Sequence, residues 1–391
     1  MRCHVCIMGA GAAGLTCAAE AASRGLDTLV LERGPGTARK VRIAGGGGCN
    51  LTNLELDAGD YLCANPHFAK SALARFTPWQ AVDLLHKGGL DTVEPHEPGR
   101  IFCAQGAEAV ADWLEERARQ AGARIRLETA VLSVRQRDGG GFLVETSGGE
   151  VACDKLVVAS GGPAWPQAGA TPDGYAVCRS LRLEVIEPRP ALVPLRAAGP
   201  LKPVCRELSG VSARVAVHLD TPPPRPVAGN LLFTHTGLSG PAALDASLFL
   251  GAGEHLVVDW LPGLDLAREL AGRDKMLVRN ALARPLPKRL AAALCRLLGW
   301  NGTLGDLGAD WPEKLDALHR HDLGLLPPDA WAKAEVTAGG VDTRAISSKT
   351  MEAQSVAGLF VVGECLDVTG RLGGYNLHWA LASGMAAGQS V

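Results

Sequence analysis

Apolar and polar positions along the chain open with a short apolar run, a glycine turn and an alanine-rich helical pattern. Residues 3–8 read CHVCIM, and helical spacing of small apolar residues covers 12–25. A second apolar run, TLVLE, follows at 28–32. A strand, a turn, a helix and a strand within about thirty residues indicate the start of a dinucleotide-binding fold.

Beyond this unit the pattern alternates between helical and strand-like segments. Helical spacing covers about 67–88 and 106–121 and dominates 264–325, and a last helix begins near 376. Strand-like runs lie at 124–128, 131–137, 141–146, 150–153, 155–159, 211–219, 230–234, 333–337 and 358–362. We predict an α/β protein with a discontinuous first domain, 1–188 and 335–391. The inserted module, 189–334, is predicted to be β-rich to about 262 and mainly helical from about 263.

The first turn carries the spacing GxGxxG. Gly9 permits a tight turn, Gly11 lets backbone approach a pyrophosphate, and Gly14 lets the helix lie close to the strand. Glu32 ends the second strand, where a carboxylate accepts hydrogen bonds from ribose hydroxyls and repels a 2′-phosphate. This pocket is therefore not expected to hold NADP. The alternative, glycines that serve only tight packing, fits the surrounding pattern less well.

The C-terminal part favours FAD over NAD. The apolar run 359–362 ends in Gly363 and Glu364, and GGYN at 373–376 opens the last helix. Flavoproteins of the glutathione reductase type hold a ribitol hydroxyl with such an acid, and a helix N-terminus faces their flavin ring. The alternative is a strand and helix that merely close the sheet.

Composition excludes several classes. Net charge is −2 and charged residues make up 20%, so the overall balance makes a nucleic-acid partner unlikely. The eleven cysteines are scattered along the chain and odd in number, which argues against a disulfide framework and a structural zinc site. No signal peptide and no apolar stretch of membrane-spanning length is evident. We expect a cytoplasmic protein with no metal and no membrane association.

Three blocks of the sequence resemble one family. They are 5–53, with LERG and ARKVRIAGGGGCNLTN; 231–244, LLFTHTGLSGPAAL; and 336–384, with TAGGV, SKTME, GE and GGYN in that order. Over the whole chain the sequence is similar to the BaiN-like (YhiN-like) flavoproteins, which are NAD(P)/FAD-dependent oxidoreductases with two dinucleotide-binding domains. The resemblance implies a Rossmann-like FAD-binding domain of the glutathione reductase type, with an inserted β-barrel-like and helical module.

The resemblance also implies cofactor contacts by position. Pyrophosphate contacts fall on the first turn, ribose and phosphate contacts on the segment after the second strand, a backbone contact to adenine on Val131, and flavin contacts on the C-terminal part. The implied residues are Gly9, Gly11, Ala12, Ala13, Gly14, Glu32, Arg33, Arg39, Lys40, Gly46, Gly47, Cys49, Asn50, Val131, Ser160, Gly161, Gly363, Glu364, Gly374, Tyr375, Asn376 and Leu377.

Two positions depart from the family pattern. Where the family usually has serine and arginine, this chain has Ala44 and Gly48. A hydroxyl and a guanidinium are therefore missing near the expected cofactor. Arg42 and Arg371 are the possible substitutes for the guanidinium.

Flavin chemistry needs orientation, electrostatics and a proton donor rather than a protein nucleophile. Candidate donors are His235, Tyr375 and Cys49, with His378 as a further histidine. Each has a structural alternative: His235 lies in a turn before a helix that Ser239 can cap, and Cys49 is small enough to pack beside FAD.

These observations predict an FAD-dependent oxidoreductase that acts on a small organic substrate where the FAD domain meets the insertion. A second GxGxxG is absent, so NADH or NADPH is expected only as a transient reductant. Two alternatives stay open: an FAD-containing RNA-modifying or RNA-associated protein, and a non-catalytic flavin-bound protein. The oligomeric state does not follow from the sequence.

Overall fold

The computed structural model describes residues 1–94, 99–219, 226–251 and 253–391. Its backbone divides into two compact units. Unit 1 comprises Met1–Pro190 and Glu335–Val391, and unit 2 comprises Ala191–Ala334. Each unit has its own hydrophobic core. The predicted α/β class, with a Rossmann-type sheet and an additional antiparallel module, is confirmed.

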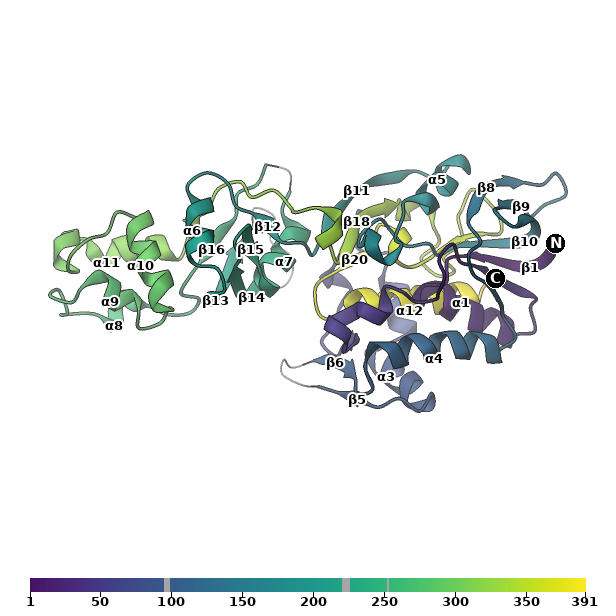
Figure 1. The fold of residues 1–391 in the computed structure, drawn as a ribbon, viewed down its shortest axis with the longest axis horizontal. Helices are drawn as coiled ribbons and strands as arrows, with labels where there is room; N and C mark the ends of the chain where they lie inside the picture. Colours follow the sequence, from purple (N-terminus) through teal and green to yellow (C-terminus); the bar gives the residue numbers. More distant parts are fainter. Residues whose placement is uncertain (95–98, 220–225, 252) are drawn as a thin grey trace. The chain divides into compact units, whose positions relative to one another are not determined.

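Unit 1 is built on a seven-stranded sheet with the order β7-β2-β1-β10-β9-β8, and β19 pairs with β10 (Figure 1). The strands β7, β2, β1, β10 and β19 run parallel, whereas β9 and β8 are antiparallel. Their bounds are β1 Arg2–Met8, β2 Thr28–Leu31, β7 Arg124–Arg126, β8 Val131–Gln136, β9 Phe142–Thr146, β10 Gly149–Val158 and β19 Leu359–Val361. The buried parallel strands are short apolar runs because helices and loops cover both faces.

A layer of helices packs against this sheet. The helices α1 (Ala12–Ser23), α12 (Tyr375–Gly388) and α4 (Gly106–Gln120) lie close together on one side of it (Figure 1). A side chain at Gly384 would place its Cβ 2.4 Å from the Ala13 carbonyl oxygen, and one at Gly388 would lie 2.8 Å from the Cys17 carbonyl oxygen. The two glycines are four residues apart on one face of α12 and let its backbone rest directly on α1.

Three small sheets and further helices complete unit 1. The small sheets are β3-β6-β5, β20-β4 and β11-β18. Their strands are β3 Asn50–Asn53, β4 Tyr61–Leu62, β5 Thr92–Val93, β6 Arg100–Cys103, β11 Val185–Ala191, β18 Val336–Val341 and β20 Thr369–Gly370. The remaining helices are α2 Lys70–Arg75, α3 Pro78–Lys87 and α5 Asp173–Ser180.

Unit 2 combines an antiparallel sheet with short helices. The sheet order is β12-β15-β14-β13-β16-β17. Its strands are β12 Leu195–Arg196, β13 Ser212–His218, β14 Val227–Phe233, β15 Gly237–Ser239, β16 Val257–Asp259 and β17 His321–Asp322. Its helices are α6 Leu201–Glu207, α7 Gly240–Phe249, α8 Leu266–Glu269, α9 Val278–Leu282, α10 Lys288–Leu297 and α11 Trp311–Leu315.

Several local predictions need correction. The segment 67–88 is two helices, because Thr77 caps α3 and Pro78 occupies its first turn. The runs 150–153 and 155–159 belong to one strand, β10. Asp154, which separates the two runs in the sequence, lies within this strand at a partly exposed position. Ser239 precedes α7 but its side chain makes no capping hydrogen bond. Among the described residues, no helix is long and apolar enough to cross a membrane.

The contact between α12 and α1 predicts the effect of one added methyl group. Gly384→Ala should lower the free energy of unfolding by about 1–3 kcal/mol, although alanine favours helix, because its Cβ would overlap the backbone of α1. Urea denaturation measures this change. The control Gln389→Ala, at an exposed position after α12, should stay within about 0.5 kcal/mol. Equal stability of Gly384→Ala and the parent would contradict the close approach.

Candidate cofactor-binding site

Four parallel strands of unit 1 end in register at one edge of the sheet. Met8 of β1 lies opposite both Leu31 of β2 and Val158 of β10, and Val158 lies opposite Val361 of β19. The turns that follow carry Gly9, Glu32, Ser160–Gly161 and Gly363. The carboxyl edge of such a sheet is where open α/β folds bind their ligands. Residues predicted from three distant parts of the sequence therefore meet at one edge.

The turn from β1 into α1 uses its three glycines in different ways. Gly9 has φ +108°, and a Cβ there would lie 2.6 Å from the Ala159 carbonyl oxygen. A Cβ at Gly14 would lie 2.0 Å from the carbonyl oxygen of Gly9, so the helix rests on the turn itself. Gly11 differs, because nothing of the protein lies within 4 Å of its Cβ position. Ala12 and Ala13 follow it as the first residues of α1.

The N-terminus of α1 is free of side-chain competitors. No side chain caps it, and its first turn contains no acidic residue. The first amide groups of a helix have no partner within the helix and carry partial positive charge. Together with the open space at Gly11, they are the groups that could hold a phosphate group.

Glu32 is fixed by the backbone around it. Its Oε2 accepts from the Ala10 amide at 2.9 Å and its Oε1 accepts from the Gly34 amide at 2.7 Å. A carboxylate has about four acceptor positions, so capacity for ribose hydroxyls remains. The Arg39 guanidinium lies close to Gly34 and makes no ion pair within the described parts of the chain. Arg33 instead pairs with Asp173 at the surface.

Lys40 and Glu364 form an ion pair between segments that are far apart in the sequence. Lys40 Nζ lies 2.7 Å from Oε2 and 2.9 Å from Oε1 of Glu364. The amide of Thr337 donates to the same carboxylate at 2.9 Å. Both charged side chains are partly exposed, at 35% and 22%. The pair joins the segment after β2 to the turn after β19.

The glycine run after Lys40 is a tight, irregular turn rather than a slack linker. Residues Val41–Gly47 form a 3-10 segment interrupted at Ala44, Gly45 and Gly46. Gly46 and Gly47 have φ +65° and +94°, are exposed, and have nothing within 4 Å of their Cβ positions. The turn leads into β3 through Cys49, which has φ +54°.

The N-terminus of α12 meets this segment. Gly374 precedes the helix with φ +96°, and its Cβ position lies 2.8 Å from Asn50 Oδ1. That oxygen is buried and has no hydrogen-bond partner. No side chain caps α12 and no acidic residue lies in its first turn. Asn376 bonds Gly370 and Arg371 and so closes the loop before the helix, while Leu377 is partly buried.

These residues fit FAD. An extended dinucleotide needs an anion site, a ribose acceptor and a site for the ring system. The uncapped α1 with Gly11, the carboxylate of Glu32 and the uncapped α12 supply these in unit 1. The unpartnered Asn50 Oδ1 is an acceptor that a flavin ring N–H would satisfy. Val131 is the first residue of β8. It lies two residues after Thr129, whose backbone amide donates to the Glu32 carbonyl oxygen.

Comparison with known proteins gives the same assignment. The family model described as the HI0933-like protein Rossmann domain matches residues 3–390. The chain belongs to the HI0933-like family. A ribosomal RNA dihydrouridine synthase of Escherichia coli is 39% identical over 98% of this chain and 97% of its own length. A ribosomal RNA dihydrouridine synthase of Haemophilus influenzae is 37% identical with the same coverage.

A third relative has a different substrate in its name. A 3-dehydro-bile acid delta(4,6)-reductase of Clostridium scindens is 30% identical over 98% of this chain and 98% of its own length. Among solved structures, 3-ketosteroid-delta4-(5alpha)-dehydrogenase of Rhodococcus jostii covers 100% of this chain and 96% of that chain, with TM-score 0.50 and 16% identity. That likeness concerns the fold alone. This HI0933-like protein is an FAD-dependent oxidoreductase by family.

The candidate proton donors have different environments. Cys49 is fully buried, and burial raises the pKa of its thiol to about 12, so it stays protonated and unreactive near neutral pH. Tyr375 is 5% exposed and its ring meets Tyr61 edge to face at 6.0 Å between centroids. His235 lies in the exposed turn between β14 and β15 of unit 2.

His378 has a structural role. Its Nε2 bonds the Phe76 carbonyl oxygen and its Nδ1 bonds Thr52 Oγ1, each at 2.9 Å. Complete burial lowers the pKa of His378 to about 4. The imidazole is therefore neutral at physiological pH and holds α12 against β3 and the end of α2.

Neither proposed substitute for the missing arginine stands free. Arg42 lies 2.7 Å from Glu108 and 2.8 Å from Asp112, both on α4. Arg371 is mostly buried, 3.9 Å from Asp60. Gly48 has negative φ, and a side chain there would first meet the Phe102 ring at 3.2 Å. Arg42 is thus committed to α4, and sequence reasoning did not anticipate this pairing.

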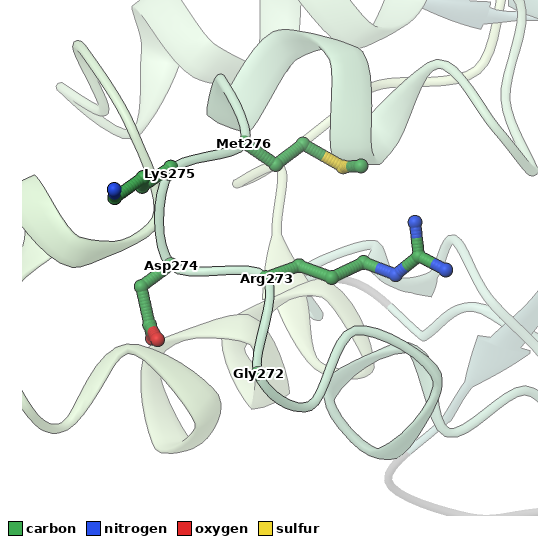
Figure 2. A pocket seen from close by; sticks show the side chains of 5 residues that line it. All are labelled: Gly272, Arg273, Asp274, Lys275 and Met276. Carbon is green, nitrogen blue, oxygen red and sulfur yellow. The ribbon is translucent and has the colours of Figure 1, made fainter.

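Unit 2 contains a separate hollow of about 470 Å³, lined by residues 272–276 between α8 and α9 (Figure 2). Arg273 and Met276 extend alongside each other from this loop, and Lys275 and Asp274 point to the other side (Figure 2). None of the predicted cofactor-binding residues lines it.

The open space at Gly11 predicts a defect in cofactor binding without a defect in folding. Gly11→Ala should weaken FAD binding by about tenfold or more, because its methyl group would occupy space next to the α1 amides and meets no protein atom. Equilibrium dialysis of FAD and urea denaturation of the FAD-free protein measure the two effects. The control Gly139→Ala, also with open space at its Cβ, should change neither. Unchanged FAD affinity of Gly11→Ala would contradict the phosphate site.

The burial of His378 predicts a pH dependence of stability. Its folded pKa, about 4, lies below the usual 6.5, so the unfolded state takes up a proton first as the pH falls. The free energy of unfolding should therefore decrease between about pH 6.5 and 4, by at most on the order of 3 kcal/mol. Urea denaturation across this range should show a flatter profile for His378→Gln and an unchanged one for His235→Gln. A parental slope in His378→Gln would contradict the assignment.

Proposed function

We propose that this HI0933-like protein is an FAD-dependent reductase that adds hydrogen across a carbon–carbon double bond conjugated to a carbonyl group, with a uridine of ribosomal RNA as substrate. The observation that carries the proposal is the 39% and 37% identity, over 98% of the chain, to two proteins named ribosomal RNA dihydrouridine synthases. The FAD-fitting residues of unit 1 supply the chemical half of the argument.

The reaction class follows from the chemistry that the relatives' names share. Conversion of uridine into dihydrouridine saturates the C5–C6 bond, which is conjugated to the C4 carbonyl. A delta(4,6)-reductase of a 3-dehydro steroid saturates bonds conjugated to a ring carbonyl. In both, a hydride adds to a carbon of the conjugated system that is remote from the carbonyl, and a proton adds to a carbon nearer to the carbonyl.

FAD, when bound and reduced by two electrons from NADH or NADPH, would supply the hydride. The chain's own residues hold and polarise the site. The α1 amides and Glu32 would bind the phosphate and adenosine half, while the uncapped α12, with its partial positive charge, would favour negative charge on the ring system. Lys40 would hold the Glu364 carboxylate in place in the turn after β19.

Burial excludes two of the candidate proton donors. The thiol of Cys49 has a pKa near 12 and holds its proton, and His378 is neutral and fully bonded. His235 is the candidate whose ring is exposed, and it belongs to unit 2. We therefore exclude Cys49 and His378 as proton donors and assign the flavin-holding role to unit 1.

A small enone is the rival substrate class. The predicted small organic substrate finds support in the bile acid reductase, whose identity of 30% is lower than that of the two RNA-modifying relatives. The rival differs in what must reach the flavin, a free ring compound instead of a base held in a polynucleotide. The two readings share the cofactor and the reaction and differ only in the substrate.

The test is an anaerobic reaction of the FAD-loaded protein with NADH or NADPH and in vitro transcribed ribosomal RNA. We expect flavin absorbance to bleach on reduction and to return when the RNA is added. Digestion of that RNA to nucleosides should then yield dihydrouridine by mass spectrometry. FAD-free protein in the same mixture is the control.

The opposite result is equally specific. Reduced flavin that is not reoxidised by ribosomal RNA but is reoxidised by 4-androstene-3,17-dione would replace the RNA substrate with a small enone. Flavin that no nicotinamide cofactor reduces would leave the flavin-bound protein without the proposed catalysis.

A further inference from the structure

Positive charge is concentrated in one part of unit 2. Between residues 268 and 296 there are two carboxylates, Glu269 and Asp274, and eight basic residues. Since the whole chain carries −2 and this segment carries +6, the remainder carries −8. The basic residues, here called the basic surface, are Arg268, Arg273, Lys275, Arg279, Arg284, Lys288, Arg289 and Arg296.

All eight of these side chains are exposed, and most have no protein partner. Arg296 bonds both carboxylate oxygens of Glu207 at 2.6 Å, and Arg289 bonds the Glu207 carbonyl oxygen. The other six make no ion pair and no side-chain hydrogen bond with the described residues. An ordinary solvated helix face pairs many of its cations with nearby acids at i,i+4 spacing, and this segment contains few acids to do so.

The local structure gathers these cations. The helix α10 buries Leu290 and Leu294 in the unit 2 core and turns Lys288, Arg289 and Arg296 to solvent. Arg289 and Arg296 are seven residues apart, which places them on one face two turns apart. The neighbouring α9 adds Arg279. Burial raises the pKa of Cys295, and the charges of Arg279 and Arg296 both oppose that rise, so the two guanidinium groups lie around the same residue.

The loop before α9 extends the basic surface. Arg273 and Lys275 project from the two sides of the loop 272–276, and Met276 extends beside Arg273 over the hollow of about 470 Å³ (Figure 2). The Trp311 indole N–H donates to Asp274 Oδ1 at 2.9 Å, which holds this carboxylate against α11. Two cations that extend to opposite sides of the loop therefore belong to the lining of this hollow.

We propose that the basic surface binds the phosphate backbone of the RNA substrate, an inference that rests on the proposed function. Unpaired, exposed arginines and lysines are the groups that neutralise phosphates and release their counterions. The acidic remainder of the chain would repel RNA elsewhere, so local charge decides where the polymer attaches. The net charge of −2, which argued against a nucleic-acid partner, conceals this separation.

An anionic membrane is an alternative partner for a cluster of cations. The packing of α10 argues against membrane binding. Membrane-surface helices insert an apolar face into lipid. The apolar face of α10 is occupied, since Leu290 and Leu294 are each 1% exposed within the unit 2 core. The basic surface is therefore left with charge alone, which suits a phosphate backbone.

The test removes three unpaired cations at once. The variant Arg273→Gln/Lys275→Gln/Arg279→Gln should bind in vitro transcribed ribosomal RNA about 10- to 100-fold more weakly at about 0.1 M salt. The slope of log K against log salt should become shallower by about 2–3, because each lost phosphate contact accounts for about 0.7–0.9. KM for RNA should rise while kcat and the flavin spectrum stay unchanged.

Two further variants serve as controls. Lys70→Gln/Arg135→Gln/Lys349→Gln removes three exposed cations of unit 1 and should leave RNA affinity and salt slope as in the parent. Arg273→Lys/Arg279→Lys keeps the charge and should retain most of the affinity. Equal losses in the basic-surface and unit 1 variants would overturn the inference, since any lost charge would then have the same effect.

The remaining outcomes separate this inference from the proposed function. RNA reduction with parental KM and salt slope in the triple variant would overturn the basic surface and leave the function standing. RNA binding that depends on the basic surface, without dihydrouridine formation, would support the surface and contradict the function. Binding to phosphatidylglycerol vesicles, but not to RNA, that the triple variant loses would overturn the inference in favour of a membrane.

Discussion

The backbone of α1 is approached from two directions at distances that exclude a side chain. On the sheet side, Gly14 sits against the carbonyl oxygen of Gly9. On the other side, Gly384 of α12 sits against that of Ala13. Because both contacts involve backbone, neither can relax by a rotamer change. The positions of α1 and α12 in unit 1 follow from these contacts, and so do the positions of their uncapped N-termini.

Electrostatics complete what the helix packing begins. The N-termini of α1 and α12 have no side-chain cap and no acidic residue in the first turn, so their partial positive charge can favour an anionic ligand. Glu32 is held by two backbone amides, and Glu364 by Lys40 and the Thr337 amide. Both carboxylates are thus oriented before any ligand binds, which lowers the entropy lost on binding.

Local sequence patterns predicted the strand–turn–helix unit and its glutamate, because the hydrophobic periodicity and the glycine spacing both lie within about thirty residues. The same patterns did not predict β3 and β6. These strands pair segments about fifty residues apart, and neither shows a clear alternation of apolar and polar residues. The packing role of Gly384 and Gly388 in α12 was not predicted, because the local sequence does not show which helical glycines contact another helix. The Lys40–Glu364 pair spans 324 residues, and only tertiary structure reveals it.

The net charge of the whole chain conceals a local separation of charge. A total of −2 led to the expectation of no nucleic-acid partner, whereas exposed cations gather on α9, α10 and the loop before them. The net charge does not describe this local surface, because acidic groups farther away than a Debye length of about 10 Å do little to weaken its positive potential. The sequence predicted helices over 264–325 and did not assign a role to their cations.

The central claim is that unit 1 binds FAD, and the flavin content of the purified protein tests it most directly. The absorbance spectrum, followed by chromatography of the cofactor released on denaturation, gives both the presence and the identity of the flavin. The account predicts a yellow protein that releases FAD, about one per chain. A colourless protein that takes up no FAD on incubation with an excess of the cofactor would contradict it.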